Sequence, residues 1–348
     1  MRESARNLLH RGAFIPAMPL VLDENRQFDE KGQRRLVRYY LESGVDGIAA
    51  GVHSTQFAIR DPKIGLFEPV LRAAQEEIAA YRARTGREVL AIAGACGEIG
   101  QAVREAEQAV AWGYDAALLS PGGLGDRDEA YLIERHRQVA KVCGVIGFYL
   151  QPAVGGRIFT YDYWRQVCAV DGVEAVKCAA FNRYCTVDVA RAIAFSGRDI
   201  ALYTGNDDNI FFDLMTTYRF RAEGKDVSVP TVGGLLGHWA AWTHRAVELF
   251  RQLKALPPDA PLSPEWLSLA ARVTDANGAF FDARNSFRGC IAGMHEVLRR
   301  QGLMKGVWCL DEKEGLSPGQ KEEIDRVYAL YPDLNDDDFV AGFLRRNP

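Results

Sequence analysis

The amino-acid sequence predicts an α/β protein, a (β/α)8 TIM barrel with a helical C-terminal subdomain. Short apolar runs recur at intervals of about 30 residues, and each is followed by a turn and a helix-periodic stretch. The runs are apolar throughout, which is typical of strands covered on both faces and therefore of parallel strands. Eight such units fit a closed barrel better than the alternative, an open doubly wound sheet, because no Gly-x-Gly-x-x-Gly follows the first run.

Each predicted element follows from a local pattern. The eight predicted strands are residues 13–17, 47–50, 89–93, 116–119, 145–150, 173–176, 200–203 and, more weakly, 229–236. The stretches between them are amphipathic, with apolar residues at spacings of three and four on one face. Asp29 and Thr186 are the predicted helix N-caps, and Gly44, Gly86 and Gly113 are predicted to end helices.

From about residue 256 the pattern becomes helical only. The segment Leu-Pro-Pro-Asp-Ala-Pro-Leu-Ser-Pro (256–264) predicts a boundary, and Ser263-Pro264 and Ser317-Pro318 each place a cap residue before a proline suited to the first helical position. We therefore predict a barrel of residues 1–255 that carries the active site and a helical C-terminal subdomain of residues 256–348.

The composition and charge of the chain limit the kinds of partner that we expect it to bind. A formal net charge of -4 and a pI near 5.9, with no run of Lys or Arg, argue against nucleic acid and membrane surfaces. The N-terminal stretch lacks a signal-peptide core, and the seven cysteines lack metal-ligand spacing. We expect a cytoplasmic protein with reduced thiols and no metal or cofactor, whose partners are a small molecule and further copies of itself.

Two predicted strands end in residues that suit imine chemistry. Lys177 closes the run 172–177, and Tyr149 closes the run 145–149. A buried ammonium is driven towards the neutral amine, which is a nucleophile. Adjacent strands lie about 4.8 Å apart, so both side chains are expected to reach one small ligand. The alternatives are a lysine that extends its ammonium to the rim and a tyrosine that is simply packed.

Two further segments follow predicted strands and offer polar groups. His53, Ser54 and Thr55 follow the second strand and suit a carboxylate, although a turn that bonds its own backbone explains the hydroxyls equally well. Gly205, Asn206 and Asp207 follow the seventh strand, where they could bind hydroxyls of a sugar-like tail or cap the next helix.

With these residues in this order, the chain resembles the dihydrodipicolinate synthase and N-acetylneuraminate lyase family of Schiff-base aldolases over about residues 10–330. Residues 149–156 are similar to the family's Tyr-Asn-x-Pro-x-x-x-Gly run, residues 174–177 to its lysine strand, and residues 204–207 to its Gly-x-Asp segment. The resemblance implies that Lys177 forms the imine with a 2-oxo acid and that Tyr149 relays protons. It also implies that the loop at residues 53–56 holds the substrate carboxylate, and that the protein is a homo-oligomer, a dimer or a tetramer.

Two departures from the family restrict the predicted reaction. Val154 stands where synthases of the lysine pathway carry an arginine, and residues 120–124 lack their second tyrosine, so dihydrodipicolinate synthesis itself is not expected. Arg157, Arg183 or Arg60 could hold a distal carboxylate instead. The sequence thus predicts a lyase, an aldolase or dehydratase, acting on pyruvate or another 2-oxo acid such as a deoxy sugar acid.

Two other classes of function remain as alternatives. One is a barrel that binds a 2-oxo acid without turning it over, because the loop at residues 52–56 departs from the family's pattern. The other is a metal-dependent hydrolase that uses His53 and His238, which lacks a His-x-His pair at the strand ends.

Overall fold

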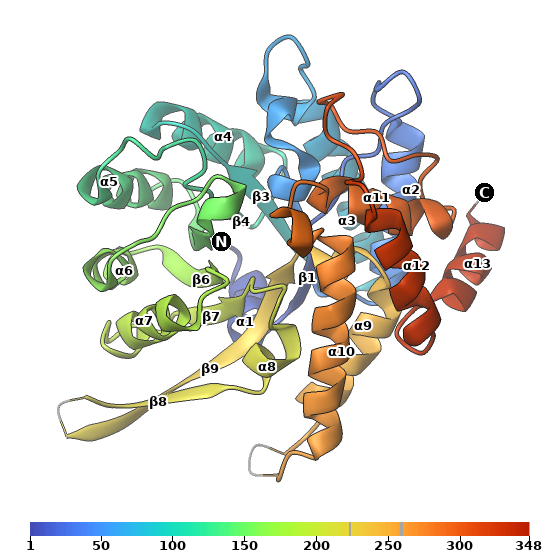
Figure 1. The fold of residues 1–348 in the computed structure, drawn as a ribbon. Coiled ribbons are helices and arrows are strands. Elements are labelled where there is room, and N and C mark those ends of the chain that lie inside the picture. Colours follow the sequence, from blue (N-terminus) through green and yellow to red (C-terminus); the bar gives the residue numbers. More distant parts are fainter. Residues whose placement is uncertain (223, 258–259, 348) are drawn as a thin grey trace. The chain divides into compact units, whose positions relative to one another are not determined.

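The computed structural model describes residues 1–222, 224–257 and 260–347, and the chain divides into two compact units, each described here by itself (Figure 1). The first unit consists of Met1–Ile15 and Leu90–Leu235, and the second contains the remainder.

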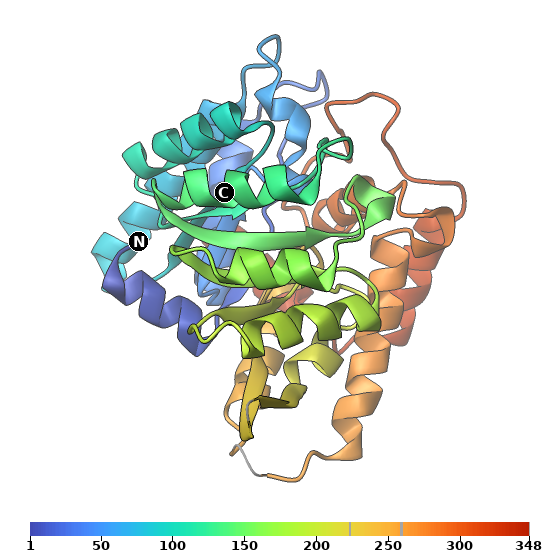
Figure 2. The same ribbon diagram turned by 90° about the vertical axis from the view of Figure 1, so that its left-hand side faces the viewer.

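The first unit is a parallel sheet with helices packed on it. Its strands follow the order β1-β9-β7-β6-β5-β4-β3, and an extra strand, β8, pairs with β9 in the antiparallel direction. Figure 2 shows the green helices of this unit lying side by side over the strands. The strands are β1 (Phe14–Pro16), β3 (Leu90–Ala95), β4 (Ala116–Leu119), β5 (Gly144–Leu150), β6 (Val173–Ala179), β7 (Ala201–Thr204), β8 (Thr217–Ala222) and β9 (Lys225–Leu236). The helices are α1 (Glu3–Arg11), α4 (Ile99–Ala111), α5 (Glu129–Ala140), α6 (Tyr161–Cys168), α7 (Arg183–Ala194) and α8 (Ile210–Leu214).

The strands of this sheet are buried along their length, as their apolar runs predict. Every residue of β3, β4, β5 and β7 is buried, and Glu174 is the partly exposed residue of β6. β6 and β9 exceed their predicted lengths by the most: β6 continues to Ala179, and β9 begins at Lys225. The sequence reading also missed β8, whose alternating polar residues pair with the exposed first half of β9.

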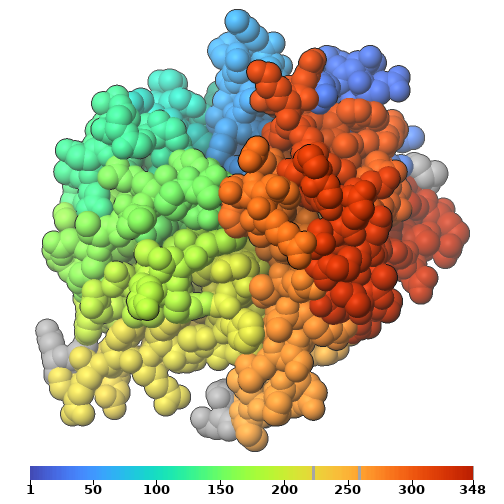
Figure 3. All heavy atoms as spheres, viewed as in Figure 1, coloured from blue at the N-terminus to red at the C-terminus, as the bar shows by residue number. Residues whose placement is uncertain are grey.

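The second unit contains one strand of the barrel and most of the remaining helices. Its β2 (Gly47–Ala50) is joined by a parallel bridge from Ala49 to Ala17, the residue after β1. Figure 3 shows the C-terminal helices, coloured orange to red, as a continuous stretch of one face. The helices are α2 (Glu30–Ser43), α3 (Phe67–Thr85), α9 (Thr243–Lys254), α10 (Pro264–Phe280), α11 (Cys290–Arg300), α12 (Gln320–Leu330) and α13 (Asp337–Arg346).

Most of the predicted helix ends are where the sequence places them. The Asp29 side chain accepts a hydrogen bond from the Gly32 N–H, and Gly44 and Gly86 adopt the left-handed conformation at helix C-termini. The cap predicted at Thr186 is wrong. Asn182 caps α7 through its side-chain oxygen, and Thr186 lies inside the helix, where its hydroxyl donates to the Asn182 carbonyl.

Eight parallel strands that alternate with helices along the chain make a (β/α)8 barrel, so the predicted fold class is confirmed. The predicted boundary segment includes Pro258 and Asp259, which lie outside the described residues. The division into a barrel of residues 1–255 and a helical subdomain of residues 256–348 stays a prediction. Among the described residues, none of the helices has the length and apolar character needed to cross a bilayer.

Candidate active site

Lys177 lies within β6 and is buried, with 7% of the residue's surface exposed. Two further residues of the strand follow it, so it does not close the strand as predicted. In the sheet register, Lys177 is opposite Phe148 of β5 and Tyr203 of β7. Residues opposite one another in a parallel pair point to the same face, so these three side chains share one face of the sheet.

The Lys177 amine rests on an aromatic ring. Its Nζ lies 4.3 Å from the centroid of Phe148, which is itself 4% exposed. Burial lowers the pKa of Lys177 to about 8, and the negative charge of Asp207 partly opposes this shift. At this pKa roughly a fifth of the amine is neutral at pH 7.4, compared with about one part in a thousand for an exposed lysine.

Tyr149 lies on the opposite face of the same strand pair. It is opposite Cys178 in the register, and its ring stacks on Trp164 at 5.5 Å and meets the edge of Phe159 at 5.4 Å. Its hydroxyl accepts a hydrogen bond from the Phe159 N–H at 3.1 Å. We call this side, which α6 and its preceding segment cover, the outer face, and the side of Lys177 the inner face.

The prediction that Tyr149 and Lys177 reach one ligand is therefore wrong in this geometry. The prediction used only the spacing between adjacent strands. In the sheet register Tyr149 is opposite Cys178, the residue after Lys177. Because side chains alternate between the two faces along a strand, Tyr149 and Lys177 point to opposite faces. Burial raises the pKa of the Tyr149 phenol, which stays protonated at neutral pH.

Gly205 packs directly against the stem of Lys177. A Cβ at this position would lie 2.5 Å from the Lys177 Cε and 2.9 Å from the Ala179 Cβ, so no side chain fits without displacing the lysine. The Gly205 N–H donates to the Cys178 carbonyl at 2.7 Å, which joins the loop after β7 to β6. The structure thus brings Gly205 and Lys177 together, and the close packing between them requires glycine at position 205.

Asn206 is part of a buried hydrogen-bond network instead of facing a ligand. Its Oδ1 accepts from the Phe181 N–H at 2.9 Å, and its Nδ2 donates to the Asp213 carboxylate at 2.8 Å and to Thr186 Oγ1 at 3.3 Å. These contacts occupy both ends of the amide. The predicted ligand role of Asn206 is therefore replaced by a role in holding the loop.

Asp213, which the sequence reading missed, is the centre of that network. It is 1% exposed, and its carboxylate accepts hydrogen bonds from Thr204, Asn206, Asn209 and Arg183. The sequence offered one indication of this role, an aspartate within the short apolar helix segment Ile-Phe-Phe-Asp-Leu. Such an aspartate is expected to be buried, and a buried carboxylate needs hydrogen-bond or charge partners.

Asp207 follows this anchored segment and is 5% exposed. Its N–H donates to the Gly205 carbonyl at 3.1 Å, which closes a tight turn beside Lys177. Its carboxylate is the negative charge that acts on the Lys177 amine. Asp207 thus follows by two positions the glycine that packs on the lysine, and its charge raises the pKa of the amine.

The three predicted residues of the second unit lie in a 3-10 turn, His53–Thr55, after β2. Both hydroxyls donate to backbone carbonyls of the segment after β1, Ser54 to Ala17 at 2.9 Å and Thr55 to Met18 at 2.7 Å. The hydroxyl protons therefore hold two loops together and are not aimed at a carboxylate. The His53 ring meets the Phe57 ring edge-on at 5.9 Å.

The arginines considered for a distal carboxylate already have partners. Arg183 bonds Asp213 and the Tyr218 hydroxyl, and Arg157 bonds the Arg127 carbonyl. In the second unit, Arg60 donates to the Gly51 carbonyl at 2.8 Å and lies 4.6 Å from the Phe67 ring. Each of these guanidinium groups thus already bonds protein groups within its own unit.

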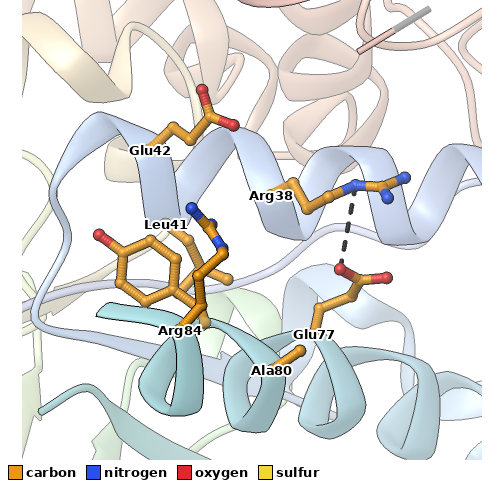
Figure 4. A pocket seen from close by; sticks show the side chains of 7 residues that line it. Arg38, Leu41, Glu42, Glu77, Ala80 and Arg84 are labelled. Atoms are coloured by element: carbon orange, nitrogen blue, oxygen red, sulfur yellow. Dashed lines mark ion pairs between the residues drawn. The ribbon is translucent and has the colours of Figure 1, made fainter. Parts of the chain in front are cut away.

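Two hollows in the second unit lie apart from the predicted residues. One, of about 120 Å³, is between α2 and α3. There the Arg38 Nε lies 3.9 Å from the Glu77 Oε2, and Figure 4 shows the two side chains turned toward each other. The other, of about 630 Å³, lies beside the Asp275–Arg326 ion pair. Over the described residues, no group of His, Cys, Asp and Glu is arranged to hold a metal ion. His238 stacks on Phe280, and burial lowers its pKa to about 4.

Comparisons with known proteins agree with the predicted resemblance. A probable 5-dehydro-4-deoxyglucarate dehydratase of Pseudarthrobacter chlorophenolicus is 34% identical over 122 residues, which are 35% of this chain and 36% of that protein. The match thus spans about a third of the curated relative. No family model matches the sequence.

Solved structures share the fold over nearly the whole chain. Dihydrodipicolinate synthase of Oceanobacillus iheyensis has a TM-score of 0.72 at 17% identity, covering 94% of this chain and 99% of that one. The enzyme of Acinetobacter baumannii, complexed with pyruvate, has a TM-score of 0.73 at 16% identity over 93% and 98%. N-Acetylneuraminate lyase of Fusobacterium nucleatum has a TM-score of 0.68 at 16% identity over 92% and 99%. The likeness to the dihydrodipicolinate synthase and N-acetylneuraminate lyase family, predicted from the motifs, is confirmed in the fold.

Proposed function

We propose that this protein is a lyase of the Schiff-base type, in which the Lys177 amine attacks the keto carbon of a 2-oxo acid. The observation that carries the proposal is the buried amine itself, held on the Phe148 ring with its pKa lowered to about 8. A lysine with a depressed pKa in the carboxyl-terminal half of a barrel strand is in the place and the state that imine formation needs.

The substrate class rests on the comparisons. Pyruvate is bound in three of the similar structures, and the curated relative is named as a dehydratase of a deoxy sugar acid. Both are consistent with a 2-oxo acid whose bond to carbon or oxygen breaks through an enamine after the imine nitrogen has withdrawn electrons. We favour a deoxy sugar acid and dehydration, because the curated match is nearer in sequence than the structural ones. A homo-oligomer in the cytoplasm stays part of this proposal.

Borohydride trapping tests the proposal. Incubation with pyruvate or 5-dehydro-4-deoxyglucarate, followed by sodium borohydride and peptide mass spectrometry, should locate a reduced adduct on Lys177. Because attack needs the neutral amine and the Lys177 pKa is about 8, the trapping rate should rise with pH up to about 8 and then level off.

The matched control is Lys177→Met, which keeps the stem and removes the amine. It should give no adduct and no product. If the wild type forms no adduct with any 2-oxo acid tested, or if the Met variant forms it as well, the proposed chemistry is wrong. Ligand-dependent thermal stabilisation with no product would instead favour the binding-only alternative.

A further inference from the structure

The place of the Lys177 amine depends on what holds its stem. The Nζ lies on the Phe148 ring, and the stem lies against Gly205, where a Cβ would be 2.5 Å from the Lys177 Cε and 3.0 Å from its Cγ. Gly205 follows the last residue of β7, so its backbone is in a turn and not in the sheet. The groups that fix this turn therefore decide whether the amine stays on the ring.

One buried carboxylate, that of Asp213 in α8, holds the turn. Its Oδ2 accepts hydrogen bonds from Thr204 Oγ1 at 2.7 Å and from Asn206 Nδ2 at 2.8 Å. Thr204 and Asn206 are the chain neighbours of Gly205, and the Asn206 N–H also donates to Thr204 Oγ1 at 3.1 Å. Because Asp213 is 1% exposed, bulk water does not replace these bonds when they break. A single oxygen atom thus holds both neighbours of the glycine.

The same carboxylate is linked to the end of β6, the strand that carries Lys177. Asn206 bonds Asp213 through its Nδ2, and its Oδ1 accepts from the Phe181 N–H at 2.9 Å. Phe181 has a φ of 48°, a left-handed conformation that a bulky residue keeps only where its surroundings fix it. The segments that follow β6 and β7 are therefore joined to one anchor.

Asp213 is also held from the side away from Gly205. Its Oδ1 accepts from Asn209 Nδ2 at 3.2 Å and from the guanidinium of Arg183, the first residue of α7. The same guanidinium donates to the Tyr218 hydroxyl at 3.0 Å. The carboxylate thus has four donors, two beside the glycine and two elsewhere, and it cannot move without breaking several of these bonds.

We infer that Asp213 is a positioning residue for the Lys177 amine. It acts through Gly205, which it holds against the lysine stem by way of both chain neighbours of the glycine. This inference rests on the proposed Schiff-base function and deepens it, because it names a residue outside the lysine's own strand that keeps the nucleophile in its place.

A positional effect of Asp213 and a direct effect of its charge have opposite signs. If the negative charge acted on the ammonium directly, its removal would lower the pKa of Lys177. If Asp213 acts by position, its removal lets the stem leave the ring and the amine becomes hydrated. The pKa of Lys177 would then rise from about 8 toward its ordinary value of 10.5.

The test is Asp213→Asn, which keeps the size of the side chain but cannot accept all four hydrogen bonds. Adduct formation with pyruvate, quenched by borohydride at intervals, is followed from about pH 7 to about pH 10. The midpoint of the pH profile should move upward by about one pH unit, and trapping at about pH 7 should be slower by roughly 10-fold, because less of the amine is neutral. Thr204→Val removes one of the four donors and should change both quantities in the same direction by less.

Asp115→Asn is the matched control. Asp115 is also buried in the first unit, at 4% exposed, but it precedes β4 at the amino end of the strands, where its Oδ2 accepts from the Ala91 N–H at 2.9 Å. Chemical denaturation should show a lower free energy of unfolding for both Asp→Asn variants. Only Asp213→Asn should move the midpoint of the pH profile, which a purely structural defect leaves in place.

The possible outcomes separate the inference from the proposed function. If Asp213→Asn traps with the wild-type rate and midpoint, or if its midpoint moves downward, Asp213 does not position the amine and the inference is wrong. If that variant does not fold, Thr204→Val decides by the same two readings. A wild type that forms no adduct would refute the proposed function, and the pKa of Lys177, measured by NMR of isotope-labelled lysine in the wild type and the variants, would then decide the inference by itself.

Discussion

The two faces of the β5–β6 strand pair bury an ionisable group each, and the consequences differ. On the outer face, Tyr149 is enclosed by Phe159 and Trp164, and burial keeps its phenol in the neutral form that donates and accepts hydrogen bonds. On the inner face, burial moves the Lys177 amine toward a neutral form that is reactive. The same desolvation therefore stabilises structure on one side and prepares chemistry on the other.

Among changes that leave the Lys177 amine in the chain, Gly205→Ala should have the largest effect on the inner face. The new Cβ would lie 2.5 Å from the Lys177 Cε, so the lysine must leave its place on the Phe148 ring. We expect the rate of borohydride trapping to fall by roughly 10²-fold, as misplacement of a reacting group by about 1 Å commonly does. Gly125→Ala is the matched control in the same unit, because a Cβ there meets nothing within 4 Å. Equal trapping by the two variants would show that the packing against Lys177 does not position the amine.

Lys177→Met should abolish the chemistry but stabilise the fold. Because the folded pKa of Lys177 is below its unfolded value, the folded state binds fewer protons above about pH 8, and the buried charge costs stability below that pH. The free energy of unfolding of the Met variant should exceed that of the wild type by about 3 kcal/mol at pH 7.

Chemical denaturation at a series of pH values measures this difference. It should narrow as the pH rises from about 8 to about 10, because the neutral amine no longer carries the desolvation cost. A difference that is absent at pH 7, or that grows with pH, would mean that the amine is solvated in the folded protein.

The sequence predicted the barrel because its signal is local. The runs at residues 47–50 and 116–119 coincide with β2 and β4, and Lys177 and the loop after β7 lie near one another as their strand positions imply. The caps at Asp29 and Ser263 likewise depend on residues within one helical turn. Strands and helix caps that depend on a few neighbouring residues could therefore be predicted from the sequence.

The parts that failed depend on register and on distant partners. Both faces of β5 are apolar and buried, so the sequence pattern did not reveal whether Phe148 or Tyr149 shares a face with Lys177. The hydroxyls of Ser54 and Thr55 bond carbonyls some 37 residues away, which no local pattern announces. The role of Asn206 was also hidden, because its amide bonds Phe181, which follows β6, and Asp213 of α8.

Tyr149→Phe should have the smallest effect and gives the sharpest comparison of the two faces. Loss of the hydroxyl leaves the buried Phe159 N–H without its acceptor, which should lower the free energy of unfolding by about 1–2 kcal/mol. The ring stays in the aromatic cluster, so packing on the outer face is retained. Since this hydroxyl faces away from Lys177, borohydride trapping should change by less than about twofold, well below the 10²-fold expected of an acid–base group. If trapping instead falls by that larger factor while the fold is intact, the phenol reaches the amine in solution, and the division of roles between the two faces is wrong.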